Sequence, residues 1–263
     1  MFSRLSAPLV AFAGSVLLLA GLIGALFWTG DPGHAHSGND PLIVFCAEAM
    51  RLPLDAIAKD YEQGFDQKVD LHFGSSMSIL ANLEMSQKGD LFLPADDSFI
   101  ELAKTRDLID DVYNIAKMHA VVIVRPNFPR PVKTWDDFLA VGNKIGLGNT
   151  DATAIGKVVK QHLQAAGRWD AVEQRAPRYL SNVNEVRNSV LLGSVDVGIV
   201  WDLVAQPHPE LTVVKLKELD GAEARVQVGL VKSSKQPEHA RQLAKHIRDK
   251  GLQFGGNLPA VEK

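Results

Sequence analysis

The sequence predicts an α/β protein built in two lobes. From Pro41 onward, apolar strand-like runs alternate with amphipathic helix-like segments, and the alternation stops at Pro126–Pro131 and then restarts. Such alternation favours parallel βαβ units. The chain has 263 residues, so the part after residue 40 is long enough for one large domain or two lobes, and the restart favours two.

The composition gives no sign of nucleic-acid binding and excludes sites that need more than one cysteine. The net charge is −3 and 22% of the residues are charged, so no basic excess indicates a nucleic-acid partner. Cys46 is the only cysteine, which excludes an intrachain disulfide and a cysteine-based zinc cluster. We interpret Cys46 as a small buried residue at the end of a strand.

The N-terminal segment, residues 1–40, predicts export. Leu5–Trp28 carries no charge and approaches the length of a membrane span, and Thr29–Asp40 has the polar, Gly/Pro-rich composition of a tether. A cleaved signal peptide and an uncleaved membrane anchor both fit, and the length favours the anchor. Either form predicts a periplasmic or other extracytoplasmic location, secreted or anchored to the membrane.

The first half of the folded part is expected to begin with a strand that runs directly into a helix. Pro41–Ala47 is a continuous apolar run, typical of a buried strand. The helix after it must begin near Ala49–Arg51, because Pro53 is tolerated only in the first turn.

The next junction is the stretch from Val69 to Glu84. Val69–Phe73 alternates apolar and polar residues, as a half-buried strand does, and Gly74 permits a sharp turn. Ser75 and Ser76 can then cap the helix that follows.

The remaining elements follow the same periodicities. We expect strands at Asp90–Pro94, Ala120–Val124 (extending back toward Ile115), Lys144–Gly148, Arg178–Leu180, Val195–Val200, Leu211–Leu216 and Arg225–Val231. We expect helices over Ser98–Thr105, Thr134–Ala140, the segment after Asn149–Gly156, the segment capped by Asn182, and Glu238–Asp249.

Four strand–turn–helix junctions carry the functional prediction: Cys46–Arg51, Phe73–Ser78, Gly148–Lys157 and Leu180–Glu185. A helix start has unpaired N–H groups and a partial positive charge, and in parallel sheets such turns lie where ligands bind. If the two lobes face each other, these starts converge on one cleft and predict an anion site that uses dipoles and hydrogen bonds instead of Lys or Arg. The alternative is that they are ordinary helix caps, which every α/β protein has.

Six segments, in order, resemble the periplasmic molybdate-binding proteins of ABC importers. They are FCAEAM at Phe45–Met50, FGSSMSILANLE at Phe73–Glu84, GDLFLPADDS at Gly89–Ser98, GLGNTDATAIGK at Gly146–Lys157, GRWDAV at Gly167–Val172 and GSVDVGIVWD at Gly193–Asp202. The resemblance implies a type II periplasmic-binding-protein fold, in which two lobes, each a mixed, mainly parallel sheet flanked by helices, are joined by two crossing strands.

The resemblance also implies the domain organisation. Residues 41–119 would form the first part of lobe 1, residues 120–224 lobe 2, and residues 225–263 the return to lobe 1 with the C-terminal helix. The crossing strands would be Ala120–Val124 and Arg225–Val231.

In this family a tetrahedral oxyanion, molybdate or tungstate, sits between the lobes, and its contacts imply the site residues here. One family serine matches Ser76, and the other falls on Ala49, which has no hydroxyl. Ser75 is a candidate substitute donor.

The contacts from lobe 2 are implied in the same way. The backbone amides of the family fall near Ala154 and Ile155 and near Val183, and its tyrosine falls on Trp201, whose indole N–H can still donate.

Acidic residues at strand ends leave a second ligand class open. Glu48 lies beside the first helix start, where a carboxylate would repel an oxyanion, and Asp96, Asp97 and Asp202 also follow strands. They are interpreted as capping or solvent-facing residues, or else as ligands of a metal cation, for which Glu48 and Asp202 are the candidates.

The resulting functional prediction is an exported, non-enzymatic solute-binding protein without a cofactor. It would close two lobes over molybdate, tungstate or a similar oxyanion and deliver it to the membrane permease of an ABC importer. The alternatives are a metal-cation protein of the same fold, for iron for example, and a membrane-tethered sensor or scaffold. No glycine-rich phosphate motif or His/Glu metal-ligand spacing indicates an enzyme.

Overall fold

The computed structural model describes residues 40–175 and 177–251. Residues from Pro41 onward form one compact unit, distinct from residues 1–40. The predicted signal peptide or anchor therefore lies outside the described residues. Among the helices that are described, none is both long enough and apolar enough to cross a membrane.

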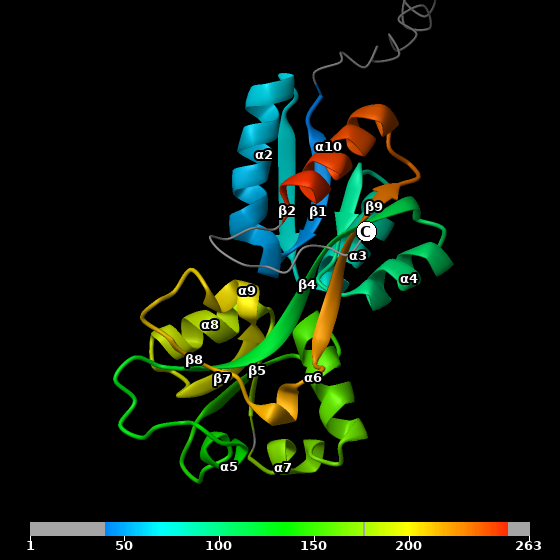
Figure 1. The fold of residues 1–263 in the computed structure, drawn as a ribbon. Helices are drawn as coiled ribbons and strands as arrows, with labels where there is room; N and C mark the ends of the chain where they lie inside the picture. The colour runs from blue at the N-terminus through cyan, green and yellow to red at the C-terminus, as the bar shows by residue number, and fades with distance from the viewer. Residues whose placement is uncertain (1–39, 176, 252–263) are drawn as a thin grey trace, which may run out of the picture. The chain divides into compact units, whose positions relative to one another are not determined.

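The described strands form one continuous sheet with the order β2-β1-β3-β9-β4-β7-β5-β6, and β8 pairs with β4 (Figure 1). The strands are β1 (Leu42–Ala47), β2 (Val69–Gly74), β3 (Leu91–Leu93), β4 (Ile109–Val124), β5 (Ile145–Gly148), β6 (Arg178–Leu180), β7 (Val197–Trp201), β8 (Thr212–Val214) and β9 (Glu223–Val231).

Helices follow most of the strands, as the alternating pattern predicts. They are η1 (Glu48–Met50), α2 (Arg51–Phe65), α3 (Ser76–Ser86), α4 (Asp97–Thr105), α5 (Trp135–Phe138), α6 (Ala154–Ala165), α7 (Trp169–Glu173), α8 (Val183–Leu191), α9 (Asp202–Ala205), η2 (Lys217–Leu219) and α10 (Pro237–Lys250). The C-terminal helix α10 packs against α2, β4 and β9, so the end of the described chain returns to the half that contains β1.

The sheet has two parallel portions, which define the two lobes. In lobe 1, β1 pairs in parallel with β2 and β3; in lobe 2, β5 pairs in parallel with β6 and β7. The registers align the carboxyl ends of neighbouring strands, because Ala47 pairs with Gly74 and Gly148 pairs with Leu180. The helix starts that follow these residues therefore share one edge within each lobe.

Strands β4 and β9 run antiparallel to each other and connect the lobes (Figure 1). Strand β4 pairs with β9 as far as His119, and its last part, Ala120–Val124, pairs with β7 and β8. The fold class predicted from the sequence is confirmed. The lobe boundaries stay predictions, since both strands continue through the junction.

The strand expected at Ala120–Val124 is longer than predicted and begins at Ile109. Its first part was missed because IDDVYN is polar at several positions and its pairing with β9 has bulges between Ile109 and Val112 and between Asn114 and Ala116. The short helices α7, α9 and η2 were also not predicted, because they span too few residues for a helical period to show.

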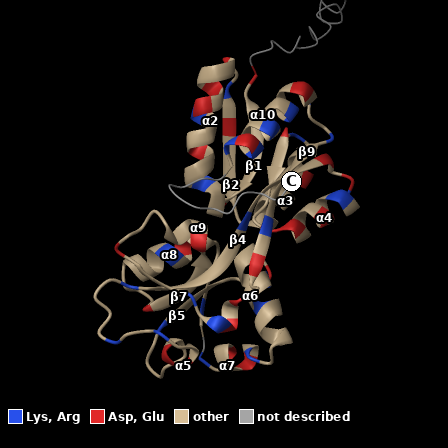
Figure 2. Ribbon diagram, in the orientation of Figure 1, with Lys and Arg blue, Asp and Glu red and all other residues tan. Residues whose placement is uncertain are grey.

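Buried apolar residues form one core that extends through both lobes. The largest fully buried side chains include Trp201, Tyr61, Phe92 and Phe138. Cys46, at the end of β1, is fully buried as expected, and its burial raises the pKa of the thiol well above its ordinary value. Charged residues of both signs are interspersed along α2, α4 and α10, in keeping with the small net charge (Figure 2).

Gly148 is required at the end of β5 because the chain turns tightly into α6. A Cβ atom there would lie 2.5 Å from Thr153 Oγ1 and 2.8 Å from Ile155 Cγ2. We expect Gly148→Ala to lower the free energy of unfolding by about 1–3 kcal/mol, measured by urea denaturation.

Gly64 offers a matched control, since a Cβ there meets nothing within 4 Å and the residue lies inside α2. Gly64→Ala should raise stability by roughly 0.5–1 kcal/mol. Equal effects of the two substitutions would contradict the steric argument.

Candidate functional site

A pocket lies between the two lobes, at the edge where the helix starts meet. It encloses about 250 Å³ of space, including space open to solvent. Lobe 1 lines it with Ala47, Glu48, Ala49, Gly74, Ser75, Ser76 and Ala95, and lobe 2 with Thr153, Ala154, Ile155, Asn182, Val183 and Trp201.

The structure brings every residue predicted for the binding site to this one pocket. These residues are Ala49, Ser75, Ser76, Ala154, Ile155, Val183 and Trp201, and the acidic candidate Glu48 lines the pocket as well. Asp202 does not. That these residues contact a ligand stays a prediction.

The two serines at the start of α3 have different roles. Ser75 is the N-cap residue: its Oγ accepts from the backbone N–H of Ser78 (3.2 Å) and donates to Ser78 Oγ (3.1 Å). Ser76 is only 2% exposed, and its Oγ accepts from the backbone N–H of Ala95 (3.2 Å). Among the described residues, the Ser76 hydroxyl hydrogen has no acceptor. Ser76 is therefore the serine whose hydroxyl can donate to a ligand.

The helix start after β1 offers backbone groups alone. The 3-10 turn η1 follows Ala47 directly and has no side-chain cap. The methyl group of Ala49 cannot donate a hydrogen bond, but the N–H groups of this first turn have no partner within their own helix. The absence of a serine hydroxyl at this position thus leaves the backbone contribution intact.

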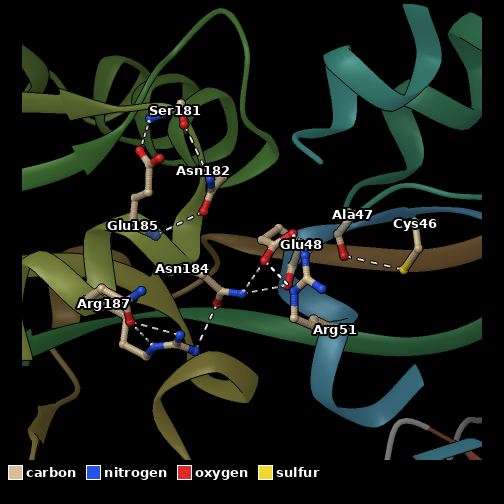
Figure 3. A network of polar contacts seen from close by, with 10 residues as sticks. Cys46, Ala47, Glu48, Arg51, Ser181, Asn182, Asn184, Glu185 and Arg187 are labelled. Atoms are coloured by element: carbon tan, nitrogen blue, oxygen red, sulfur yellow. Dashed lines mark hydrogen bonds and ion pairs between the residues drawn. The ribbon is translucent and has the colours of Figure 1, made fainter. Parts of the chain in front are cut away.

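Lobe 2 supplies two capped helix starts. Thr153 caps α6, where its Oγ1 accepts from the N–H of Gly156 (3.1 Å) and donates to the carbonyl of Asn149 (2.8 Å). Asn182 caps α8 and accepts from the N–H of Glu185 (3.0 Å), while the Glu185 carboxylate accepts from the N–H of Ser181 (3.0 Å; Figure 3). These caps hold the two helix ends in place beside the pocket.

Sequence reasoning did not identify some of the lining residues. Thr153 could have been found, because a threonine ahead of a helical apolar stripe is a typical N-cap. Ala95 gave no signal, since its place depends on its hydrogen bond to Ser76 from another segment.

Trp201 lies where lobe 2 closes one wall of the pocket. It is 1% exposed, ends β7 and pairs with Ala120 of β4. In the part of the chain that the structure describes, its indole N–H has no hydrogen-bond acceptor. This donor can serve a ligand in place of a tyrosine hydroxyl.

The pocket has no cationic lining residue among those described, and its one acidic residue is paired. Glu48 accepts from Arg51 through Nε (2.6 Å) and Nη2 (2.8 Å), and the hydrogen bond to Glu48 raises the pKa of Arg51. The pair is therefore neutral overall. The repulsion that Glu48 was expected to exert on an anion is largely compensated.

Asp202 and Asp96, two further acidic candidates, are occupied by capping or pairing. Asp202 Oδ1 accepts from the backbone N–H groups of His119 (3.1 Å) and Leu203 (2.8 Å), and Asp96 accepts from the N–H of Ser98 (2.7 Å). Within residues 40–175 and 177–251, no group of three or more His, Cys, Asp or Glu residues is placed to hold a metal ion.

The arrangement can bind a small anion through hydrogen bonds. Each bond from a neutral donor to a charged ligand contributes about 1.5–3 kcal/mol, whereas a helix end adds typically about 0.3–1 kcal/mol. Direct donation by peptide N–H groups, the Ser76 hydroxyl and the Trp201 indole therefore outweighs the dipoles. The dipoles favour a negative ligand over a positive one.

The chain matches one protein family and is similar in sequence to bacterial binding proteins. The family model described as bacterial extracellular solute-binding protein matches residues 42–253. A binding protein of Haemophilus influenzae is 25% identical over 224 residues, covering 83% of this chain and 91% of the relative. The molybdate-binding protein ModA of Escherichia coli is 24% identical over 188 residues, covering 68% of this chain and 72% of the relative.

Solved structures share the fold. The periplasmic molybdate-binding protein of Azotobacter vinelandii superposes with a TM-score of 0.68 at 17% identity, over 79% of this chain and 92% of that chain. Iron-bound HitA of Pseudomonas aeruginosa superposes with a TM-score of 0.60 at 14% identity, over 84% of this chain and 90% of that chain.

The cap of α6 can be tested directly. We expect Thr153→Ala to lower the free energy of unfolding by about 1 kcal/mol, because the N–H of Gly156 loses its acceptor. Thr153→Ser keeps the hydroxyl and should lose less. Urea denaturation of the three proteins checks this, and equal losses in the two variants would show that the hydroxyl does not cap the helix.

Proposed function

This chain belongs to the bacterial extracellular solute-binding proteins, and from that premise we propose that it captures molybdate, tungstate or a similar tetrahedral oxyanion between its lobes. The family consists of solute-binding proteins and not of enzymes, which agrees with the sequence-based expectation. The observation that carries the proposal is the convergence of four helix starts, η1, α3, α6 and α8, on one pocket without a lining cation.

The chemistry of the donors supports an oxyanion. Helix starts from both lobes line the pocket, so their N–H groups would donate to a ligand from several sides, and a tetrahedral oxyanion presents acceptor oxygens in all directions. The relatives named as molybdate-binding proteins support the choice of ion. Ser76 would be the hydroxyl donor and Trp201 the indole donor, with backbone contacts from Ala49, Ile155 and Val183.

Delivery is the second part of the proposal. The exported protein would bind its ion outside the cytoplasm and would pass it to the membrane permease of an ABC importer. Closure of the lobes about β4 and β9 would exclude water from the ion, and reopening would release it. Residues 1–39, which would be cleaved or would anchor the chain, lie outside the described residues. A tethered sensor or scaffold is the alternative role of an anchored chain.

A metal cation is the alternative ligand, because iron-bound HitA shares the fold. The carboxylate expected to bind it, Glu48, is engaged by Arg51 and Asn184, and Asp202 lies away from the pocket. These contacts favour the oxyanion.

Calorimetric titration tests the proposal. We expect binding heat with molybdate or tungstate and weaker or no heat with sulfate, phosphate and ferric ion. No heat from any of the four oxyanions would contradict the proposed function. Heat from ferric ion alone would support the cation alternative.

Ser76 is expected to contribute directly. Ser76→Ala should weaken oxyanion binding by about tenfold or more, because one hydrogen bond to the charged ligand is lost. Ser86→Ala, an exposed serine at the other end of α3, is the matched control and should bind as the natural protein does. Equal affinities of the two variants would show that the Ser76 hydroxyl does not contact the ligand.

Trp201 provides an optical test. Because it lines the pocket, bound oxyanion should change the tryptophan fluorescence, and Trp201→Phe should abolish that change and weaken binding by up to about tenfold. Trp169→Phe should retain the signal, since Trp169 lies outside this pocket. Persistence of the full signal in Trp201→Phe would show that the ligand binds elsewhere.

A further inference from the structure

We infer that Asn184 is a positioning residue that holds the two lobes together over the bound ion by bridging to Glu48. The inference rests on the proposed function, since it concerns how long that ion stays bound. Asn184 lies in the first turn of α8 in lobe 2, and Glu48 begins η1 in lobe 1. The Asn184 Nδ2 group donates to the backbone carbonyl of Glu48 (2.9 Å) and to its Oε1 (3.2 Å; Figure 3).

The bridge lies directly beside the pocket. Val183, the neighbour of Asn184, lines the pocket from lobe 2, and Glu48 and Ala49 line it from lobe 1. The bridge therefore joins two of the helix starts that surround the proposed ion. Separating these helix starts requires that both hydrogen bonds of Asn184 break.

The amide of Asn184 is held in one orientation. Its Oδ1 accepts from Arg187 Nη1 (3.1 Å), so its Nδ2 group is directed at Glu48 (Figure 3). Arg187 itself is partly desolvated, and this burial lowers the pKa of its guanidinium. On the other lobe, the two bonds from Arg51 fix the Glu48 carboxylate. Each of these orienting bonds lies within one lobe, so none of them has to break when the lobes separate.

Burial shields this bridge from water more than two other hydrogen bonds between the lobes. Asn184 is 8% exposed and the Glu48 side chain 15% exposed, so water competes weakly for their hydrogen bonds. The contact of Lys157 Nζ with Ser98 Oγ (2.7 Å) joins two partly exposed side chains, and the backbone bond from Met77 N to Ala152 O is long, at 3.4 Å. Among these three hydrogen-bonded contacts, the loss of the one made by Asn184 should affect closure most.

The test is the dissociation rate of molybdate, followed by stopped-flow tryptophan fluorescence, with the affinity measured by calorimetry. Asn184→Ala should release molybdate about tenfold faster, with little change in the association rate. Asn184→Asp should release it faster still, because its carboxylate would face that of Glu48. Asn82→Ala, an exposed asparagine on α3, is the matched control and should match the natural protein.

The outcomes separate this inference from the proposed function. If the natural protein binds molybdate and Asn184→Ala releases it at the natural rate, the inference is wrong. If the natural protein binds no oxyanion, the proposed function fails, and small-angle X-ray scattering of the free proteins decides on the bridge. A larger radius of gyration for Asn184→Ala than for Asn82→Ala would support the bridge, and equal radii would overturn it.

Discussion

The structure depends on the parallel register of two strand pairs. Because β1 is level with β2 and β5 is level with β6, the helices that follow them begin at a common edge in each lobe. In β2 half-buried and exposed residues alternate, so a slip of one residue would turn its half-buried side chains to solvent. The core packing that fixes this register therefore also fixes where the helix starts lie. The pocket is a consequence of core packing as much as of its own lining residues.

The pocket combines neutral hydrogen-bond donors with one carboxylate whose charge is balanced by a neighbouring arginine. A site built from Lys or Arg would attract many anions, whereas a site built from oriented N–H groups favours a ligand whose oxygens match their directions. Glu48 fits this scheme because Arg51 neutralises it and Asn184 bonds to it. The residue that looked least suited to an anion site therefore has a structural role in joining the lobes.

Much of the candidate site could be predicted from the sequence because its parts are local. Strand period, turn residues and capping residues placed the helix starts within a residue or two, and the family motifs indicated Ser76 and Trp201. The bond from Asn184 to Glu48 and the contact of Ala95 with Ser76 could not be predicted, since each joins different segments of the chain. The first part of β4 was missed because polar side chains and bulges conceal its period.

The burial of Cys46 has a practical consequence for studying lobe motion. It is the only thiol in the chain, it is fully enclosed at the end of β1, and burial disfavours its reactive thiolate form. In the folded protein, the Cys46 thiol should therefore not react with maleimide dyes. A cysteine introduced on the surface of either lobe would be the single labelled position, which makes this scaffold suited to a reagentless optical biosensor for its ligand.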